Sequence, residues 1–183
     1  IRAAYKTRLQ TMGHASAGQD CTSHISAMDR DGNMVALTNT LLSRFGSKTV
    51  APSLGLTLNN GMMWFDPRLG KPNSIAPGAA PLANMSPAIT TLDGKPDIAI
   101  GAAGGRQIFP AIAQILSKII DRSVSPEQAL HETRIDASSP TILVNRAASA
   151  DTASAIAKDH PVQITENSLY PVQFAIPSLV QAG

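Results

Sequence analysis

Two runs with a period of two residues flank the dipeptide Asp31-Gly32, and no other feature of the sequence constrains the fold as strongly. Residues 24–29 (HISAMD) and 34–41 (MVALTNTL) alternate in side-chain character, as strands with one buried face do. An Asp-Gly pair between such runs favours a tight turn, because glycine adopts positive φ without steric cost. The sequence therefore predicts a β-hairpin that turns at residues 30–33.

Further strands are expected along the chain. A turn at Asp93-Gly94 separates two of them, and prolines without a clear period make residues 65–78 typical of a long surface loop. Residues 162–165 are the last strand that the pattern predicts. The other predicted strands are residues 54–59, 86–92, 97–101 and 141–144.

Three helices follow from spacing and capping signals. After Gly104-Gly105, isoleucines recur at helical spacing, and Pro110 is tolerated because it falls in the first turn. Ser125 caps a second helix that ends near Arg134, with Gln128 completing a capping box. A short alanine-rich helix is expected at residues 151–158. Strand runs followed by a helical pair favour an α+β domain with a largely antiparallel sheet.

Composition excludes several classes of function. The chain has 183 residues, which suits one globular domain, and its formal charge of +2 is spread without a basic run. Nucleic acid is therefore not an expected partner. The lone Cys21 cannot form an internal disulfide, and no Cys/His cluster has zinc spacing. No apolar run is long enough to span a membrane, so no membrane partner is evident.

The start of the chain suggests a longer natural protein. It opens with Ile1 and enters directly what is predicted to be a helix, followed by a polar, glycine-containing loop that reaches Asp20. We expect the natural N-terminus to lie upstream, which leaves the compartment, periplasmic or cytoplasmic, open. A cleavable junction would suit the loop.

An ordered series of short motifs runs from Thr22 to about Arg134. It resembles the small subunit of γ-glutamyltranspeptidases, which implies an αββα sandwich of the N-terminal-nucleophile hydrolase class. The resemblance also implies a precursor that cleaves itself, with residues 1–21 ending the large-subunit region and residues 22–183 forming the catalytic small-subunit domain. The motifs are Thr22-Ser23-His24, Asp31-Gly32-Asn33, Thr38-Asn39-Thr40, Phe45-Gly46, Leu58-Asn59-Asn60, residues 81–87 (PLANMSP) and Gly104-Gly105.

The resemblance implies that Thr22 is the nucleophile, released by cleavage after Cys21. In the precursor its hydroxyl would attack the Cys21 carbonyl, and the freed α-amino group would then serve as general base for the same hydroxyl. An α-amino group suits this role because its unperturbed pKa lies near neutrality. Without the resemblance, Thr22 is an ordinary β-branched strand residue.

Two further sites carry implied catalytic roles. By resemblance, Thr40 orients the amino end of Thr22, although Thr38 and Thr40 on one strand face also suit simple cross-strand packing. Gly104 and Gly105 stand at a strand-to-helix junction, where backbone N–H groups can converge on an oxyanion. The alternative is a tight turn that needs positive φ. A phosphate-binding loop fits less well, because the segment has neither the lysine of a P-loop nor the spacing of a dinucleotide fingerprint.

Five positions depart from the family pattern for reading the charged ends of a γ-glutamyl group. Losing such polar partners should weaken recognition of that group strongly, so we expect a less polar or differently charged acyl group, as in the related cephalosporin and glutaryl acylases. Residues 59–67 (NNGMMWFDP) resemble that branch, and Asp66 is a further candidate for the pocket lining. The five positions are Leu42, Gly61, Trp64, Ala83 and Asn84.

The sequence thus predicts an enzyme that resembles γ-glutamyltransferases and glutathione hydrolases and works through an acyl-Thr22 ester. Its substrates would be a small γ-glutamyl or other amide and either water or an amine acceptor, with a large subunit from the same precursor as partner. No cofactor or metal is expected, and none of the four histidines is assigned to catalysis. The alternatives are an acylase for non-glutamyl acyl groups, or an inactive fragment that needs its large subunit.

Overall fold

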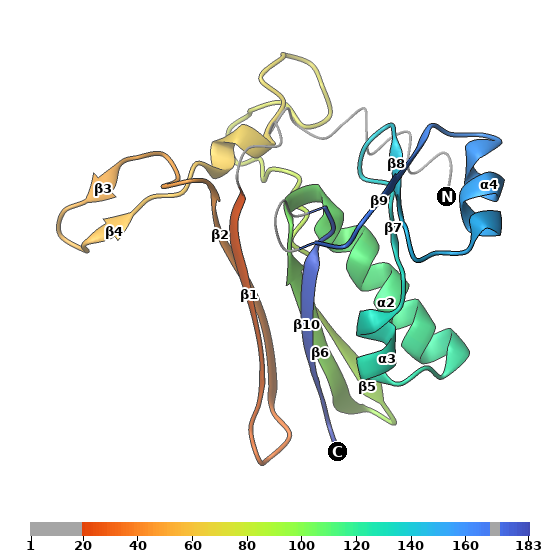
Figure 1. Cartoon of the computed structure of the whole chain (residues 1–183). Coiled ribbons are helices and arrows are strands. Elements are labelled where there is room, and N and C mark those ends of the chain that lie inside the picture. The colour runs from red at the N-terminus through yellow and green to blue at the C-terminus, as the bar shows by residue number, and fades with distance from the viewer. Residues whose placement is uncertain (1–19, 169–172) are drawn as a thin grey trace. The chain divides into compact units, whose positions relative to one another are not determined.

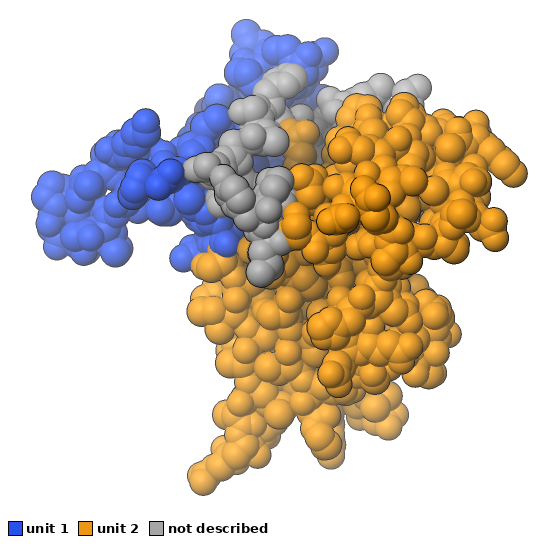
Figure 2. All heavy atoms as spheres, viewed as in Figure 1, with its two compact units in different colours: residues 1–22, 39–84 blue, residues 23–38, 85–183 orange. Residues whose placement is uncertain are grey.

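The computed structural model describes residues 20–168 and 173–183. The helix expected at the start of the chain, and most of the loop after it, lie outside these residues. Two compact units can be distinguished, and Figure 2 colours them separately. Of the described residues, the first unit holds 20–22 and 39–84, whereas the second holds 23–38, 85–168 and 173–183.

Strands β1 (Asp20–Met28) and β2 (Met34–Ser43) form a two-stranded sheet, which confirms the predicted hairpin. The strand begins earlier than expected, because the loop was predicted to continue through Asp20. The Cys21-Thr22 peptide bond therefore lies inside β1 and not in a loop.

The turn of the hairpin is organised by one carboxylate. Oδ1 of Asp29 accepts hydrogen bonds of 2.9 Å from the amides of both Asp31 and Asn33, and Oδ2 accepts one of 2.8 Å from the Asn33 side chain. The Asn33 side chain is the main cause that holds the pKa of Asp29 below its ordinary value. Gly32 has a φ of +82°, the left-handed conformation for which the Asp-Gly signal selects.

The second unit is built around strand β6 (Lys95–Ala103), which pairs antiparallel with β5 (Ala88–Leu92) on one side and with β10 (Ile176–Gln181) on the other (Figure 1). The turn between β5 and β6 falls at Asp93-Gly94, as predicted, and both residues have positive φ. The prediction that residues 162–165 are the last strand is wrong. Pro177 obscured β10, but β10 is an edge strand, where a proline costs no ladder hydrogen bond on the open side.

Helix α2 (Ile108–Arg122) covers one face of this sheet and forms the main core with it. Alternate residues of β6 point toward the helix, whose buried positions recur three and four residues apart. Pro110 lies in the first turn of the helix, as expected. The buried core residues of β6 and α2 are Ile98, Ile100, Ala102, Ile108, Ala111, Ile112 and Ile115.

The opposite face of β6 contacts the hairpin. A Cβ atom built on Gly101 would overlap the imidazole ring of His24, so glycine lets β1 approach the sheet closely at this point. Helix α2, the three-stranded sheet and the 23–38 part of the hairpin therefore form successive layers. This arrangement confirms the predicted α+β class.

The remainder of the second unit is a smaller α+β portion. Ser125 Oγ accepts the amide of Gln128 at 3.2 Å and so caps α3, but the Gln128 side chain donates to Glu132, so the reciprocal half of the predicted capping box is missing. Helix α3 also ends at His131, before the expected Arg134. Strands β7 and β8 are antiparallel, and β8 and β9 are parallel. The elements are η2 (Gly105–Gln107), α3 (Pro126–His131), β7 (Ile135–Asp136), β8 (Ile142–Asn145), α4 (Ala150–Ala157) and β9 (Val162–Thr165).

The first unit has little regular structure. The strand predicted at residues 54–59 shrinks to β4 (Leu56–Thr57), paired with β3 (Val50–Ala51), and a 3₁₀ helix, η1 (Gly61–Trp64), follows. Residues 65–78 form a loop as predicted, but Phe65 and Asp66 are buried, so the loop has a small core of its own. None of the helices in residues 20–168 and 173–183 has both the length and the apolar character of a membrane span.

The packing of His24 on Gly101 gives a stability prediction. Gly101→Ala should lower the free energy of unfolding by about 1–3 kcal/mol, because the added methyl group overlaps the imidazole ring. Urea unfolding of the two single variants and of the pair Gly101→Ala with His24→Ala measures this. Gly101→Ala should lower the free energy of unfolding much less in the His24→Ala protein than in the wild type. Equal losses in the two proteins would contradict the contact between Gly101 and the His24 ring.

Candidate active site

The hydroxyl of Thr40 joins both sides of the predicted cleavage point. Its Oγ1 accepts a hydrogen bond of 3.0 Å from the Thr22 hydroxyl and donates one of 3.3 Å to the carbonyl oxygen of Cys21. Thr22 and Thr40 lie on β1 and β2, and the unit that contains them also contains Cys21. The structure thus brings the predicted nucleophile, its partner and the scissile carbonyl together.

A third contact fixes the Thr40 oxygen. The amide of Leu42 donates to it at 2.8 Å, and Leu42 itself has a φ of +70°, which is uncommon for a residue with a branched side chain. Backbone strain of this kind costs on the order of 1–3 kcal/mol and is concentrated at functional sites.

The Asn-Asn motif anchors the end of β2 to η1. Asn60 donates from Nδ2 to Ser43 Oγ at 2.7 Å, and its Oδ1 accepts the amide of Ser43 at 3.0 Å. The Asn59 side chain accepts the amide of Gly61 at 2.9 Å. Gly46, at a φ of +56°, lies so close to the Leu58 carbonyl that a Cβ atom would overlap it. These motif residues therefore hold the backbone that follows Thr40.

His24 is a structural residue held on both ring nitrogens. Nδ1 is 2.8 Å from the Thr38 hydroxyl and Nε2 is 2.9 Å from the Ser26 hydroxyl. Burial lowers its pKa from the ordinary 6.5, which favours the neutral ring. His14 lies outside the described residues.

Gly104 and Gly105 lie in the second unit, where β6 gives way to η2 and α2. Their φ angles are +139° and +56°, and the amide of Gln107 donates to the Gly104 carbonyl at 3.1 Å. A tight turn is thus present, and both glycines occupy conformations that side chains rarely adopt. The role of these glycines as oxyanion donors stays a prediction.

The predicted specificity positions all lie in the first unit. Gly61 contacts the Trp64 ring, since a Cβ atom built there would be 3.4 Å from two ring carbons. Ala83 is exposed, whereas Asn84 is 8% exposed. Asp66 is fully buried and forms a two-point ion pair with Arg68, which raises the pKa of the guanidinium. That pairing argues against the predicted role of Asp66 in a substrate pocket.

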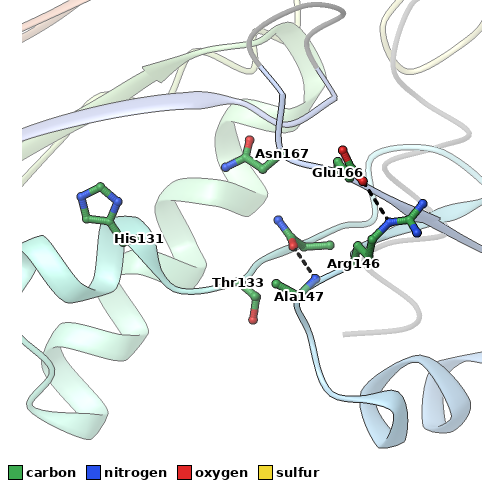
Figure 3. Close-up of a pocket in the computed structure, with 7 residues that line it drawn as sticks. His131, Thr133, Arg146, Ala147, Glu166 and Asn167 are labelled. Atoms are coloured by element: carbon green, nitrogen blue, oxygen red, sulfur yellow. Dashed lines mark hydrogen bonds and ion pairs between the residues drawn. The ribbon is translucent and has the colours of Figure 1, made fainter.

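A shallow pocket of about 580 Å³ lies in the second unit, away from the predicted catalytic residues in sequence (Figure 3). Arg146 and Glu166 form an ion pair of 3.2 Å within it, with side chains 69% and 70% exposed. Such exposed pairs contribute little. We assign no chemistry to this pocket. In the described part of the chain, no group of three His, Cys, Asp or Glu side chains could hold a metal ion.

Comparison with known proteins identifies the family behind this geometry. The family model described as Gamma-glutamyltranspeptidase matches residues 2–176, nearly the whole chain. The chain belongs to the γ-glutamyltranspeptidase family. The family predicted from the ordered motifs is therefore confirmed.

Two curated relatives illustrate the branches of the family. The glutathione hydrolase proenzyme of Pseudomonas sp. (strain A14) is 37% identical over 123 residues, which cover 62% of this chain and 21% of that protein. The acylase ACY 1 proenzyme of Pseudomonas sp. (strain V22) is 31% identical over 153 residues, which cover 83% of this chain and 27% of that protein. The chain thus spans about a quarter of the length of these relatives.

Solved structures agree with this placement. A γ-glutamyltranspeptidase from Pseudomonas nitroreducens, complexed with L-DON, matches with a TM-score of 0.71 at 26% identity, over 88% of this chain and 89% of that chain. A cephalosporin acylase from Bacillus halodurans matches with a TM-score of 0.76 at 23% identity, over 87% of this chain and 30% of that chain. At that identity the acylase supports the fold alone.

Sequence reasoning missed two contacts of the candidate site. The contact of Thr40 with the Cys21 carbonyl was not predicted, because the junction was expected in a loop. The amide of Leu42 was also missed, since no residue pattern marks a non-glycine residue with positive φ. The interval between Thr22 and Thr40 was the available signal, because in a hairpin that turns at residues 30–33 the two face each other.

The environment of His24 predicts a pH dependence of stability. Because its folded pKa is lowered, the unfolded chain binds the proton more readily, so the unfolding free energy should fall as pH drops below about 6.5 toward the folded pKa. His24→Gln, which can still bond both hydroxyls, should remove that part of the loss between pH 7.5 and 5.5. His131→Gln, which removes an exposed histidine, is the control; an unchanged pH profile in His24→Gln would contradict the assignment.

Proposed function

We propose that this chain carries the catalytic small-subunit region of a self-processing amide hydrolase or acyltransferase, with Thr22 as nucleophile. One observation carries the proposal: the Thr40 hydroxyl bonds the Thr22 hydroxyl and the Cys21 carbonyl at once. Membership of the γ-glutamyltranspeptidase family and the proenzyme names of the relatives support it.

The hydrogen-bond directions around Thr40 suit self-cleavage. Thr40 accepts from the nucleophilic hydroxyl and donates to the carbonyl oxygen that gains negative charge as Thr22 attacks. The attack forms an ester on Thr22 and frees its amino group, and water then releases the Cys21 carboxylate. The new α-amino group can act as general base in later turnovers, in which an acyl-Thr22 ester passes to water or an amine.

Gly104 and Gly105 are our candidates for the oxyanion donors in turnover. They carry no side chains of their own, have positive φ angles and lie next to the start of α2. Each well-placed donor in such a site is worth about 3 kcal/mol of barrier. The reaction draws nucleophile, base and donors from the chain itself.

The outer face of the hairpin supports a large-subunit partner from the same precursor. On this face Ile25, Val35 and Leu37 are 59%, 54% and 52% exposed, although each alternates with half-buried neighbours. Strands with apolar residues on both faces are normally covered on both. We propose that the large-subunit region covers them and completes an αββα sandwich, with residues 1–21 as its end and 22–183 as the small-subunit domain.

Self-cleavage is the first prediction of this proposal. The full-length precursor should give a new N-terminus at Thr22 on incubation, and Thr22→Ala should give none. Thr40→Val, which keeps the shape but removes the hydroxyl, should slow cleavage at least about a hundredfold, whereas Thr40→Ser should restore most of the rate. Intact mass with N-terminal sequencing over time measures all four proteins.

Thr38→Val is the matched control for Thr40→Val, because Thr38 lies two residues earlier on β2 and its hydroxyl bonds the His24 ring. It should cleave at nearly the wild-type rate. Rapid cleavage in Thr40→Val would contradict the proposed role of that hydroxyl. A wild-type precursor that stays whole and turns nothing over would favour the inactive-fragment alternative.

A second candidate differs in the acyl group. Asp66 is the only acidic residue between positions 39 and 84, and it is buried in its ion pair with Arg68. This segment therefore offers no other carboxylate to bind the α-ammonium of a γ-glutamyl group. Leu42, Ala83 and Asn84 are uncharged. These observations favour an acylase that accepts glutaryl-like groups, in keeping with the long match to the acylase relative.

Two anilides that differ only by the α-ammonium test this candidate. Processed enzyme should hydrolyse a glutaryl anilide with kcat/KM at least about tenfold above that for the γ-glutamyl anilide. Residues 39–84 offer no free carboxylate to offset the desolvation of the α-ammonium. Release of the aniline is followed spectroscopically. A micromolar KM for the γ-glutamyl anilide with poor glutaryl turnover would select the transpeptidase function instead.

A further inference from the structure

One glutamine ties the Gly104-Gly105 turn to two distant segments. Nε2 of Gln107 donates to the carbonyl oxygen of Gln173 at 2.7 Å and to Oδ2 of Asp136 at 3.2 Å. Gln107 is the last residue of η2, the turn that Gly104 begins. Its side chain therefore fastens this turn to the stretch before β10 and to β7.

The acceptor on β7 is itself held in place. Asp136 is 4% exposed, and its carboxylate accepts the Ser138 hydroxyl at 2.8 Å and the Ser138 amide at 3.1 Å. A buried carboxylate with these partners has little freedom to follow a moving donor. Gln107 thus bonds to a fixed point.

The stretch before β10 also presses directly on the glycine turn. A Cβ atom on Gly104 would lie 2.7 Å from Cα of Ala175, so the two backbones are in contact. Phe174 and Ala175 are buried, and the guanidinium of Arg134 reaches the Ala175 carbonyl at 3.5 Å while bonding the Leu130 carbonyl at 2.7 Å. Burial lowers the pKa of Arg134.

We propose that Gln107 is a positioning residue that, together with residues 173–175, sets the backbone of Gly104 and Gly105 for oxyanion binding. The inference rests on the proposed function, in which those two glycines supply the donors. A catalytic group that is misplaced by about 1 Å can lower the rate about a hundredfold. A side chain that holds the Gly104-Gly105 turn in place therefore affects the rate of the reaction. Gln107 touches no reacting atom in this scheme and acts through the turn.

The test replaces Gln107 by methionine, which has a similar shape but makes neither hydrogen bond. In processed enzyme, Gln107→Met should lower kcat by about ten- to hundredfold while KM stays within about twofold, because the turn matters most in the transition state. Gln107→Glu should lower kcat at least as much as Gln107→Met. The new carboxylate cannot donate a hydrogen bond to the Gln173 carbonyl, and it would lie next to the carboxylate of Asp136.

Gln114→Met is the matched control. Gln114 lies on α2 and ties the helix to Ile135 of β7 by bonds of 2.8 and 3.0 Å, so its loss removes similar anchoring without touching the turn. It should lower stability comparably but leave kcat within about twofold. Equal kcat in Gln107→Met and wild type, or equal losses in Gln107→Met and Gln114→Met, would overturn the inference.

Amide hydrogen exchange separates failure of this inference from failure of the proposed function. Gln107→Met should speed exchange in the peptide that spans residues 101–108, and Gln114→Met should not. If the wild-type protein neither cleaves itself nor turns over anilides, the proposed function fails, and the exchange result still decides whether Gln107 holds the turn. Unchanged amide exchange at residues 101–108 in Gln107→Met would contradict the inference that Gln107 holds the turn.

Discussion

The hydrogen bonds of a single hydroxyl, that of Thr40, are the constraint on which the candidate site depends. A hydroxyl has one proton and two lone pairs, and all of them are engaged here: it donates to the Cys21 carbonyl and accepts from Thr22 and from the Leu42 amide. The position of each partner is fixed by other parts of the chain. The hairpin places Thr22 opposite Thr40, and Asn60 holds the end of β2 through Ser43, next to the Leu42 amide.

Close approach of backbones is the second constraint, and glycine permits it in both units. Gly101 makes room for the His24 ring, Gly46 for the Leu58 carbonyl and Gly104 for Ala175. In each case the neighbour is a ring or main chain, which cannot move aside as a long side chain could. Gly46 and Gly104 belong to the motifs that resemble the family, so these motifs reflect packing requirements as well as chemistry.

Local signals predicted well, and non-local ones did not. Asp31-Gly32, Ser125 and the isoleucine spacing of α2 act within a few residues, so the hairpin, the cap and the helix could be derived from the sequence. Strand β10 could not, because it is defined by pairing with β6, some 80 positions away in sequence, and Pro177 hides its period. The Gln107 side chain was missed for the same reason, since its partners lie at 136 and 173.

The start of β1 at Asp20 has a consequence for the state after cleavage. If the Cys21-Thr22 bond is cut as proposed, the new ammonium of Thr22 starts beside Thr40, because both residues already lie in the hairpin. Asp20 and Cys21, the part of β1 ahead of the proposed cut, would then lose their covalent link to Thr22. A two-residue strand end held by pairing alone frays readily. Under the proposed function, fraying of this end would uncover the Thr22 hydroxyl, so the cut that frees the amino group would also give a substrate access to it.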